Sequence, residues 1–254
     1  MMRDKGIFAA STGLMILAWA LAAWVKADPQ ILPGPLEVLR IAWAETLSGA
    51  LPHHMAATLW RVALSFALAM GLGTAIGIAL GLMPRVDRWA DPWVIVFLNL
   101  PALMVIVLCY LWIGLSEVAA IVAVTLNKAA MVIVTLREGT RALDRPMAEM
   151  AQVYRLSPAA RLRHVMLPQL APHVATAARN GLAMIWKIVL VAEFLGRSDG
   201  IGFQIHFYFQ LFQTGHLLAY ALAFVALMVA ADRLVITPWT RAANVWRGNT
   251  IAVG

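Results

Sequence analysis

Charged residues are scarce in this sequence. Only 13% of its 254 residues are Asp, Glu, Lys or Arg, whereas an average soluble domain carries about 25%. Hydrophobic residues make up 62% of the chain, and the mean hydropathy is +0.78. These values disfavour a soluble domain and predict an all-α polytopic membrane protein, organised as one transmembrane domain over residues 1–254.

Cysteine and nucleotide-binding motifs are also scarce. The single cysteine, Cys109, excludes an internal disulfide and a cysteine metal motif. No glycine-rich loop of the form G-x-x-x-x-G-K occurs, so we do not expect the chain itself to bind ATP. The six histidines form no ligand pattern, and no serine–histidine–acid set can be argued from spacing. We therefore expect neither a metal centre nor a catalytic site.

Acidic residues are fewer than basic ones, 13 against 20, which gives a formal net charge of +7. Such a balance can indicate a nucleic-acid-binding protein, but here the basic residues stand in short loops between apolar runs. The tendency of cytoplasmic loops to be rich in Lys and Arg explains this arrangement better. We expect a bilayer rather than a nucleic acid as partner, with both termini in the cytoplasm; basic residues assigned to that side include Arg85, Arg88, Arg233, Arg241 and Arg247.

Apolar runs of about 20 residues, long enough to cross a bilayer, recur along the chain. We expect six spans, near 6–25, 58–83, 92–113, 118–136, 173–192 and 214–231. The first is interpreted as an uncleaved helix, because a signal peptide has a shorter apolar core. Residues 84–91 are expected to form a short inner loop. The outer segments are 27–57, with an amphipathic helix marked by Leu36, Leu39 and Trp43, and 194–213, with a short helix in FQIHFYFQLF.

Two spans carry further signals. In the second, Ala69, Gly73, Gly77 and Gly81 recur at four-residue steps, and small residues at this spacing allow another helix to approach closely. In the third, Asn99 and Pro101 interrupt the apolar run. A proline there can kink the helix and free a backbone carbonyl group.

The longest polar island, residues 137–172, is strongly basic and lies between the fourth and fifth spans. Two short amphipathic helices are predicted within it. Asp144 can cap the first, with Pro146 in its first turn, and its apolar stripe consists of Met147, Met150, Ala151 and Tyr154. Ser157 and Pro158 can start the second, and we expect it to end at Leu167–Pro168, because a residue before proline avoids helical geometry.

Residues Glu149-Met150-Ala151, Ser157, Leu167-Pro168 and Pro172 resemble the "EAA" loop of ATP-binding-cassette (ABC) importer permeases. The resemblance extends from about residue 32 to 233, and LPGPLEVL (32–39) and VAEFLG…GIGF (191–203) are most similar to the sulfonate, taurine, nitrate and bicarbonate branch. One departure is that the family's loop glycine is Arg155 here, with Leu156 replacing an alanine. Glycine suits a left-handed residue at a helix end, so either the turn differs or some strain is tolerated.

The resemblance implies a type I ABC importer permease in the bacterial inner membrane that works by alternating access. It implies two ATPase subunits bound to the coupling loop, 143–168, a second permease copy and a periplasmic substrate-binding protein. ATP and Mg would be held by the ATPase subunits and no cofactor by this chain. The residues it assigns to ATPase coupling are Glu149, Met150, Ala151, Tyr154, Arg155, Ser157, Leu167 and Pro168.

Polar residues inside the apolar runs are the candidates for a translocation pathway, because a charge in mid-membrane is costly unless it faces a bundle interior or water. They are Asn99, Asn127, Lys128, Lys187 and Glu193. The two lysines favour a small organic or inorganic anion as substrate, while a structural ion pair with Glu193 is the alternative for them. A heteroaromatic or amine substrate stays open. A membrane-embedded enzyme or a passive channel is disfavoured, since the spans lack clustered His or acidic residues and a channel has no use for the loop.

Overall fold

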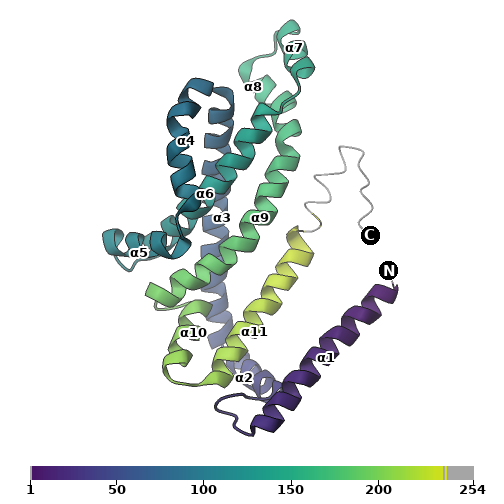
Figure 1. Ribbon diagram of the computed structural model, residues 1–254, viewed down its shortest axis with the longest axis vertical. Helices are drawn as coiled ribbons and strands as arrows, with labels where there is room; N and C mark the ends of the chain where they lie inside the picture. Colours follow the sequence, from purple (N-terminus) through teal and green to yellow (C-terminus); the bar gives the residue numbers. More distant parts are fainter. Residues whose placement is uncertain (1, 237, 239–254) are drawn as a thin grey trace. The chain divides into compact units, whose positions relative to one another are not determined.

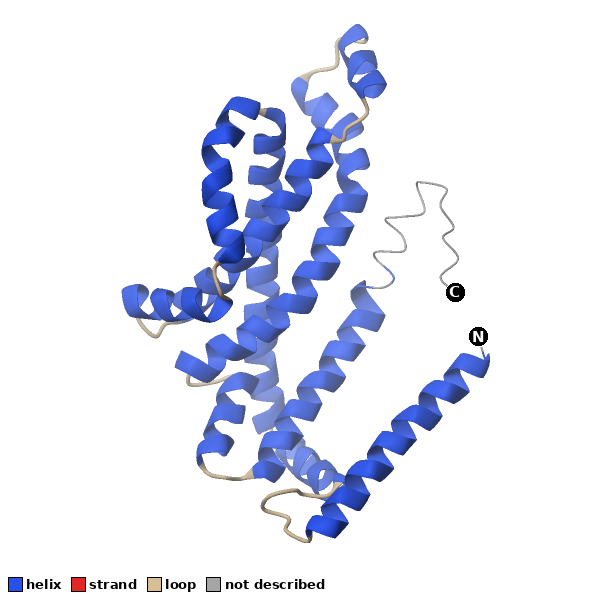
Figure 2. Ribbon diagram, viewed as in Figure 1, coloured by secondary structure: helices blue, strands red, loops and turns tan. Residues whose placement is uncertain are grey.

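A computed structural model describes residues 2–236 and 238, and in this part of the chain helices joined by loops are present, without strands (Figures 1 and 2). The elements, in chain order, are α1 (Met2–Lys26), α2 (Pro35–Leu47), α3 (Ala50–Leu82), α4 (Pro84–Asn99), α5 (Ala102–Ile113), α6 (Glu117–Arg141), α7 (Arg145–Val153), α8 (Pro158–Arg161), the π-helical turn η1 (Leu162–Met166), α9 (Leu167–Gly196), α10 (Ile201–Gln210), α11 (Thr214–Ala231) and the π-helical turn η2 (Asp232–Ile236). The predicted inner residues Arg241 and Arg247 lie outside the described part.

Four segments are long and apolar enough to cross a membrane: α3, α6, the continuous helix from Pro158 to Gly196, and α11 with its extension to Leu234. The pair α4 and α5 counts as a fifth if the two helices together form one bent span. In α1 the described apolar stretch is shorter, Ala10–Lys26. Each of the six predicted runs therefore falls on a helix, although the third is not a single straight one.

The third predicted span differs most from expectation. Residues 84–91, predicted as a loop, form the first two turns of α4, with Pro84 at its first position. The chain then bends by 99° between α4 and α5, at Leu100–Pro101. Pro101 lacks a backbone N–H and cannot continue the ladder, which explains a break at this point. Charged residues fit inside α4 because Asp87, on its buried side, has cationic partners on α6.

The chain forms two compact units. Unit 1 consists of Met1–Thr58 and Glu193–Leu227, and unit 2 of Leu59–Ala192 and Met228–Gly254. In unit 2, the glycine stripe of α3 lies directly against α6. A Cβ atom added at Gly73 would stand 2.6 Å from Cβ of Val132, and one at Gly77 would stand 2.7 Å from the carbonyl oxygen of Ile133. The small residues therefore set how closely these two helices approach.

The core of unit 2 surrounds α6, on which fifteen residues of the 25-residue helix are buried. Val132 and Leu136 pack with Leu170 and Ala177 of α9, and Ile133 packs with Leu80 of α3 and Val94 of α4. Helix α6 is thus the central helix of this unit, while apolar side chains on the outer faces of α3, α4 and α5 stay exposed.

Unit 1 contains the predicted amphipathic helix as α2. Its residues Leu36, Leu39 and Trp43 are exposed, and Val38 is buried. The Trp19 indole on α1 donates a hydrogen bond to the Pro33 carbonyl oxygen at 3.1 Å, which ties α1 to the segment before α2. The FQIHFYFQLF stretch, expected to hold a short helix, corresponds to α10.

Candidate functional site

The coupling loop in unit 2 projects past the ends of α6 and α9, as Figure 1 shows. In α7, Glu149 is exposed, as are Met147, Met150 and Tyr154 of the predicted apolar stripe, whereas Ala151 is buried. Asp144 stands at the predicted cap position, but its side chain makes no capping hydrogen bond. The loop therefore presents a carboxylate among exposed apolar side chains on a short helix.

Arg155 occupies the turn that ends α7. Its φ of +50° lies in the left-handed region. Its N–H donates to the Gln152 carbonyl oxygen at 2.9 Å, and the Leu156 N–H donates to the Ala151 carbonyl oxygen at 3.0 Å. This pair of bonds defines a Schellman motif, in which glycine is the usual left-handed residue. The turn is thus formed by an arginine, at the cost of some backbone strain.

The second helix of the loop starts as expected and then continues. The Ser157 hydroxyl accepts a hydrogen bond from the Ala160 N–H at 3.2 Å, and Pro158 follows at the first helical position. The expected end at Leu167–Pro168 is wrong, because the helix passes through η1 directly into α9. Pro168 cannot donate to the preceding turn, and a π-helical turn is a common way to accommodate such a gap. Leu167 and Pro168 are exposed on this continuous helix.

Lys128 lies midway along α6, and only 8% of it is exposed. Its ammonium group donates to the Met184 sulfur on α9 at 3.1 Å. One turn earlier, the Thr125 hydroxyl is buried and lacks a hydrogen-bond partner in the described part of the chain. A buried cation therefore meets a weak, neutral acceptor and lies one helical turn from an unsatisfied hydroxyl group.

The other predicted pathway residues of unit 2 lie in different surroundings. The Asn127 amide donates to the Leu100 carbonyl oxygen at 3.4 Å, so it binds the backbone at the break between α4 and α5. Asn99 is exposed and donates to the Ile95 carbonyl oxygen of its own helix at 2.8 Å. Lys187 is exposed on α9. Only Asn127 and Lys128, neighbours in sequence, are both withdrawn from the surface.

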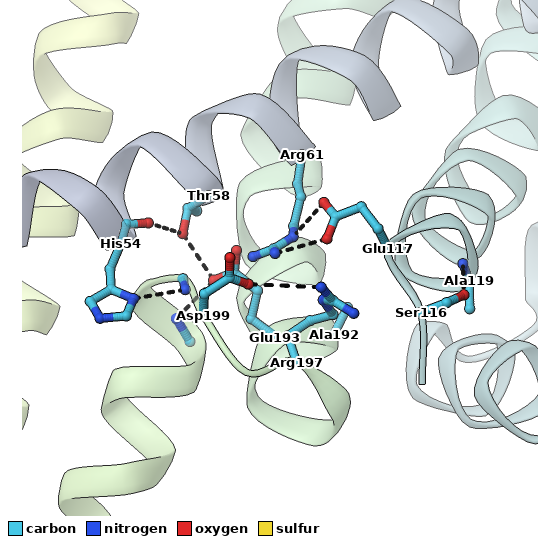
Figure 3. A network of polar contacts seen from close by, with 12 residues as sticks. His54, Thr58, Arg61, Ser116, Glu117, Ala119, Ala192, Glu193, Arg197 and Asp199 are labelled. Carbon is cyan, nitrogen blue, oxygen red and sulfur yellow. Dashed lines mark hydrogen bonds and ion pairs between the residues drawn. The ribbon is translucent and has the colours of Figure 1, made fainter. Parts of the chain in front are cut away.

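Glu193, in unit 1, is fully buried at the end of α9. Its carboxylate accepts hydrogen bonds from the Thr58 hydroxyl and the Gly202 N–H, each at 2.9 Å (Figure 3). The Ile201 N–H donates to the Thr58 hydroxyl oxygen at 2.9 Å, and the Gly200 N–H donates to His54 Nδ1 at 3.1 Å. The carboxylate thus sits at the N-terminus of α10, where the helix dipole favours a negative charge. These contacts stabilise the start of α10, and a role of Glu193 in the translocation pathway stays a prediction.

Gly200 is required by this arrangement for two reasons. Its φ is +104°, which is unfavourable for side chains, and a Cβ atom there would overlap the Glu193 carboxylate. The motif VAEFLG…GIGF therefore encodes a clamp, consisting of Glu193, Thr58 and the start of α10. Sequence reasoning found the motif and missed the clamp, because Thr58 is 135 residues away along the chain.

Two ion-pair groups in unit 2 were not predicted. Arg137 on α6 contacts Asp87 Oδ1 at 3.1 Å and Asp91 Oδ1 at 2.6 Å, both on α4, and Arg141 also binds Asp87. Arg61 on α3, only 2% exposed, forms two hydrogen bonds to the Glu117 carboxylate at 2.8 and 2.9 Å (Figure 3). In the sequence, these ion pairs are indicated only by the presence of opposite charges within the predicted loops and at the ends of the predicted spans. Their partners could not be assigned without the helix arrangement.

A further polar cluster in unit 1 joins α2, α10 and α11. The buried Tyr220 hydroxyl donates to Glu45 Oε2 at 2.7 Å, and His216 Nε2 lies 3.9 Å from Glu45 Oε1. Tyr208 stacks on His216 with ring centroids 4.7 Å apart. Burial and, secondarily, the Glu45 carboxylate raise the pKa of the Tyr208 hydroxyl. Within the described residues, no cluster of His, Cys, Asp and Glu could hold a metal ion.

Comparison with known proteins identifies a family. Residues 69–235 match the family model described as "Binding-protein-dependent transport system inner membrane component". A relative in Bacillus subtilis that carries the name of an aliphatic sulfonates transport permease, SsuC, is 30% identical over 88% of this chain and 83% of its own length. The taurine transport system permease protein TauC of Escherichia coli is 29% identical over 92% of this chain and 87% of its own length.

A solved structure is also similar. A chain of the MetNI methionine ABC transporter, in an inward-facing conformation, matches with a TM-score of 0.62 and 18% identity. The match covers 78% of this chain and 98% of that chain. At this identity the similarity establishes the fold alone, which is that of the membrane subunit of an ABC importer.

Proposed function

The chain belongs to the family of binding-protein-dependent transport system inner membrane components, and from this premise we propose that it imports a small organic or inorganic anion. The observation that carries the proposal is Lys128, a cation with 8% exposure whose hydrogen bond goes to a thioether sulfur. The names of relatives, which refer to aliphatic sulfonates and taurine, support an organosulfonate as the cargo class.

Lys128 supports an anion because its charge has no opposite charge nearby in the described part of unit 2. A buried ammonium group is costly to keep in a low-dielectric region, and a sulfur atom compensates little of that cost. An anion that passes close to Lys128 gains the attraction that the chain leaves unused. The Thr125 hydroxyl, which lacks a partner among the described residues, adds a hydrogen-bond donor one turn away.

We also propose the other subunits of the importer. Two ATPase subunits hold ATP and Mg and bind the loops of two permease copies, which form a homodimer, and a periplasmic binding protein delivers the substrate. The loop faces the cytoplasm, as do both termini. Closure of the ATPase pair on ATP draws the loops together and changes the permeases between inward- and outward-open states by rigid-body motion.

The loop geometry supports an ATPase as its partner. Glu149 is exposed on a helix whose neighbouring Met147 and Met150 are 44% and 38% exposed. A charged group surrounded by exposed methionines is typical of a surface that another protein covers. The coupling-loop residues of this chain therefore serve transport rather than catalysis.

The test is uptake of taurine or an alkanesulfonate into proteoliposomes that contain the complete importer. Lys128→Met keeps the length of the side chain and removes its charge. We expect uptake to fall at least about tenfold. Without the charge of Lys128, the substrate loses between about 1.4 kcal/mol and several kcal/mol of binding free energy, and 1.4 kcal/mol corresponds to a factor of about ten. Arg179→Met, an exposed cation on α9, is the matched control and should retain uptake. Lys187→Met tests whether the second lysine contributes.

A separate variant tests the machinery. Glu149→Lys should abolish transport and release the ATPase, while the permease remains folded and inserted. Full transport by this variant would refute the assignment of the loop. If the Lys128→Met variant forms a stable complex and takes up every tested anion as the wild type does, the assignment as an importer still holds. That result would favour the non-anionic alternative, a heteroaromatic or amine substrate.

A further inference from the structure

His54 is a half-buried histidine near the start of α3, and its ring makes a contact that only the neutral form allows. Its Nδ1 accepts a hydrogen bond from the N–H of Gly200, the residue before α10 begins, at 3.1 Å. A ring nitrogen that accepts a backbone N–H carries no proton, so the single proton of the neutral ring lies on Nε2. The contact therefore requires an unprotonated Nδ1.

The other ring nitrogen is consistent with this tautomer. His54 Nε2 lies within hydrogen-bond distance of the side-chain amide of Gln204. The Oε1 atom of that amide is buried and has no hydrogen-bond partner among the described residues. The amide can turn about its last bond so that Oε1 accepts the Nε2 proton, which satisfies both groups. His54 thus contacts both ends of the first turn of α10.

Three side chains of unit 1 hold the start of α10. Each accepts a hydrogen bond from one of three successive N–H groups, which have no acceptor of their own because they stand at the first turn of a helix. The pairs are Gly200 with His54 Nδ1 at 3.1 Å, Ile201 with the Thr58 hydroxyl oxygen at 2.9 Å, and Gly202 with the Glu193 carboxylate at 2.9 Å (Figure 3).

These three acceptors respond differently to acid. A carboxyl group keeps an acceptor oxygen in either protonation state, and a threonine hydroxyl always has lone pairs. An imidazole that carries protons on both nitrogens has no acceptor left. Histidine is also the side chain that ordinarily changes its charge between about pH 5 and 8. A proton on His54 Nδ1 would face the Gly200 N–H, donor against donor, so acid breaks this contact and spares the other two.

We propose that His54 is a pH switch for the start of α10, in which the neutral ring holds Gly200 and the protonated ring releases it. The hydrogen bond is present at neutral and alkaline pH and is lost as the pH falls. This inference goes beyond the proposed function, because it concerns how the segment 194–213 responds to its surroundings and requires no particular cargo.

The surroundings of His54 accommodate a second proton on its ring. Charged and titratable groups come from every element of unit 1 that neighbours it, and among them three carboxylates stand against one arginine. An excess of negative charge favours a cation. The groups are His53 on its own helix, with ring centroids 5.2 Å apart, Tyr220 on α11, at 6.2 Å, with Glu45 of α2 bound to its hydroxyl and His216 3.9 Å from Glu45, Glu193 at the end of α9, and Arg197 with Asp199, 3.9 Å apart, in the turn before α10.

The test is hydrogen exchange at the first amides of α10 in the complete importer in nanodiscs, corrected for the intrinsic pH dependence of exchange. As the pH falls from about 8 to 5, exchange at the Gly200 amide should accelerate about tenfold. Exchange at Gly202, which the Glu193 carboxylate holds, should change much less. His54→Asn places an amide oxygen close to the position of Nδ1 and does not titrate, so Gly200 should stay protected over the whole range.

Two further variants complete the test. His54→Leu removes the acceptor, so Gly200 should exchange rapidly at every pH. His53→Asn, at the exposed neighbouring position, is the matched control and should keep the pH dependence of wild type. An unchanged pH dependence in His54→Asn would overturn the proposal. If His54→Asn disturbs the fold, which fast exchange at Gly202 would reveal, the wild type decides, because exchange at its Gly200 amide that does not vary with pH also overturns the proposal.

The outcomes separate this inference from the proposed function, because hydrogen exchange is measured without cargo. Normal uptake of taurine together with pH-independent exchange at Gly200 would refute the pH switch alone. A pH-dependent Gly200 amide in an importer that takes up no anion would refute the anionic cargo alone. Uptake at an outer pH of about 8 and of about 5 then shows whether the switch affects transport, since only the wild type, and not His54→Asn, should lose the contact in acid.

Discussion

Two buried cations on the same helix, α6, show opposite ways of holding a charge inside this protein. Arg137 and Lys128 are nine positions apart and each is 8% exposed. Arg137 has two carboxylate partners on α4, at 3.1 and 2.6 Å, whereas Lys128 donates to a methionine sulfur. The two cations are equally buried, but only Arg137 has carboxylate partners. The charge of Arg137 therefore stabilises the fold, whereas that of Lys128 is available to a ligand.

The same distinction applies to the other buried charges. Arg61 binds the Glu117 carboxylate in unit 2, and Glu193 in unit 1 accepts hydrogen bonds from Thr58 and Gly202. Each of these groups has partners within its own unit. Burial alone would have assigned all of them to the pathway, and the identity of the partner distinguishes Lys128 from the rest.

The largest effect is expected from breaking the compensated group. Arg137→Leu removes one of the two cationic partners of the buried Asp87 carboxylate, which keeps Arg141, and also the Arg137 partner of Asp91. Removal of one member of a buried ion pair typically costs about 3–5 kcal/mol, so the unfolding free energy of the permease in detergent should fall by this order. The added change Asp87→Asn should recover part of the loss, and failure to recover any would mean that the ion pair is not the cause.

A smaller loss is expected at the clamp in unit 1. Glu193→Leu leaves the Gly202 N–H without its acceptor, whereas the Thr58 hydroxyl keeps the His54 carbonyl oxygen at 3.2 Å. An unsatisfied buried group costs about 1–3 kcal/mol. Hydrogen exchange at the first amides of α10 should accelerate. Glu193→Gln keeps one acceptor oxygen and should be milder. Unchanged exchange in Glu193→Leu would show that α10 does not depend on the carboxylate.

The smallest change in stability, and one of opposite sign, is expected at Lys128. Lys128→Met removes a buried charge that has no counter-ion in the described part of unit 2, so the permease should gain about 1 kcal/mol, a fraction of the insertion cost of a mid-membrane cation. Uptake should fall in the same variant. A loss of stability comparable to that of Arg137→Leu would erase the contrast between the two cations.

Local patterns in the sequence predicted the helices well. The apolar runs gave α3, α6, α9 and α11, the Ser157-Pro158 pair gave the start of α8, and the proline after Asn99 marked the break in the third run. These features depend on residues within one or two helical turns of each other, so periodicity and capping chemistry are sufficient to find them. The same local logic failed at Leu167–Pro168, where a π-helical turn carries the helix through.

The candidate site was only partly accessible from the sequence. The polar residues inside the spans could be listed, and Lys128 could be singled out by its position in an apolar run. Whether a charge was compensated could not be predicted, because the partner of Arg137 is 50 residues away and that of Glu193 is 135 residues away. Likewise, the sequence left two alternatives open at Arg155, a different turn or a strained left-handed residue, and could not decide between them.

By itself, then, the sequence determined that this is a helical membrane protein with a basic loop between its fourth and fifth apolar runs, since hydropathy and charge act through the solvent and do not depend on which helix meets which. The tertiary structure alone decided the angle of 99° at the break that Pro101 marks between α4 and α5, and the partners of the buried charges. A buried charge is stabilised or left available by groups that only helix packing brings within about 4 Å of it, where electrostatic attraction in a low dielectric is strongest.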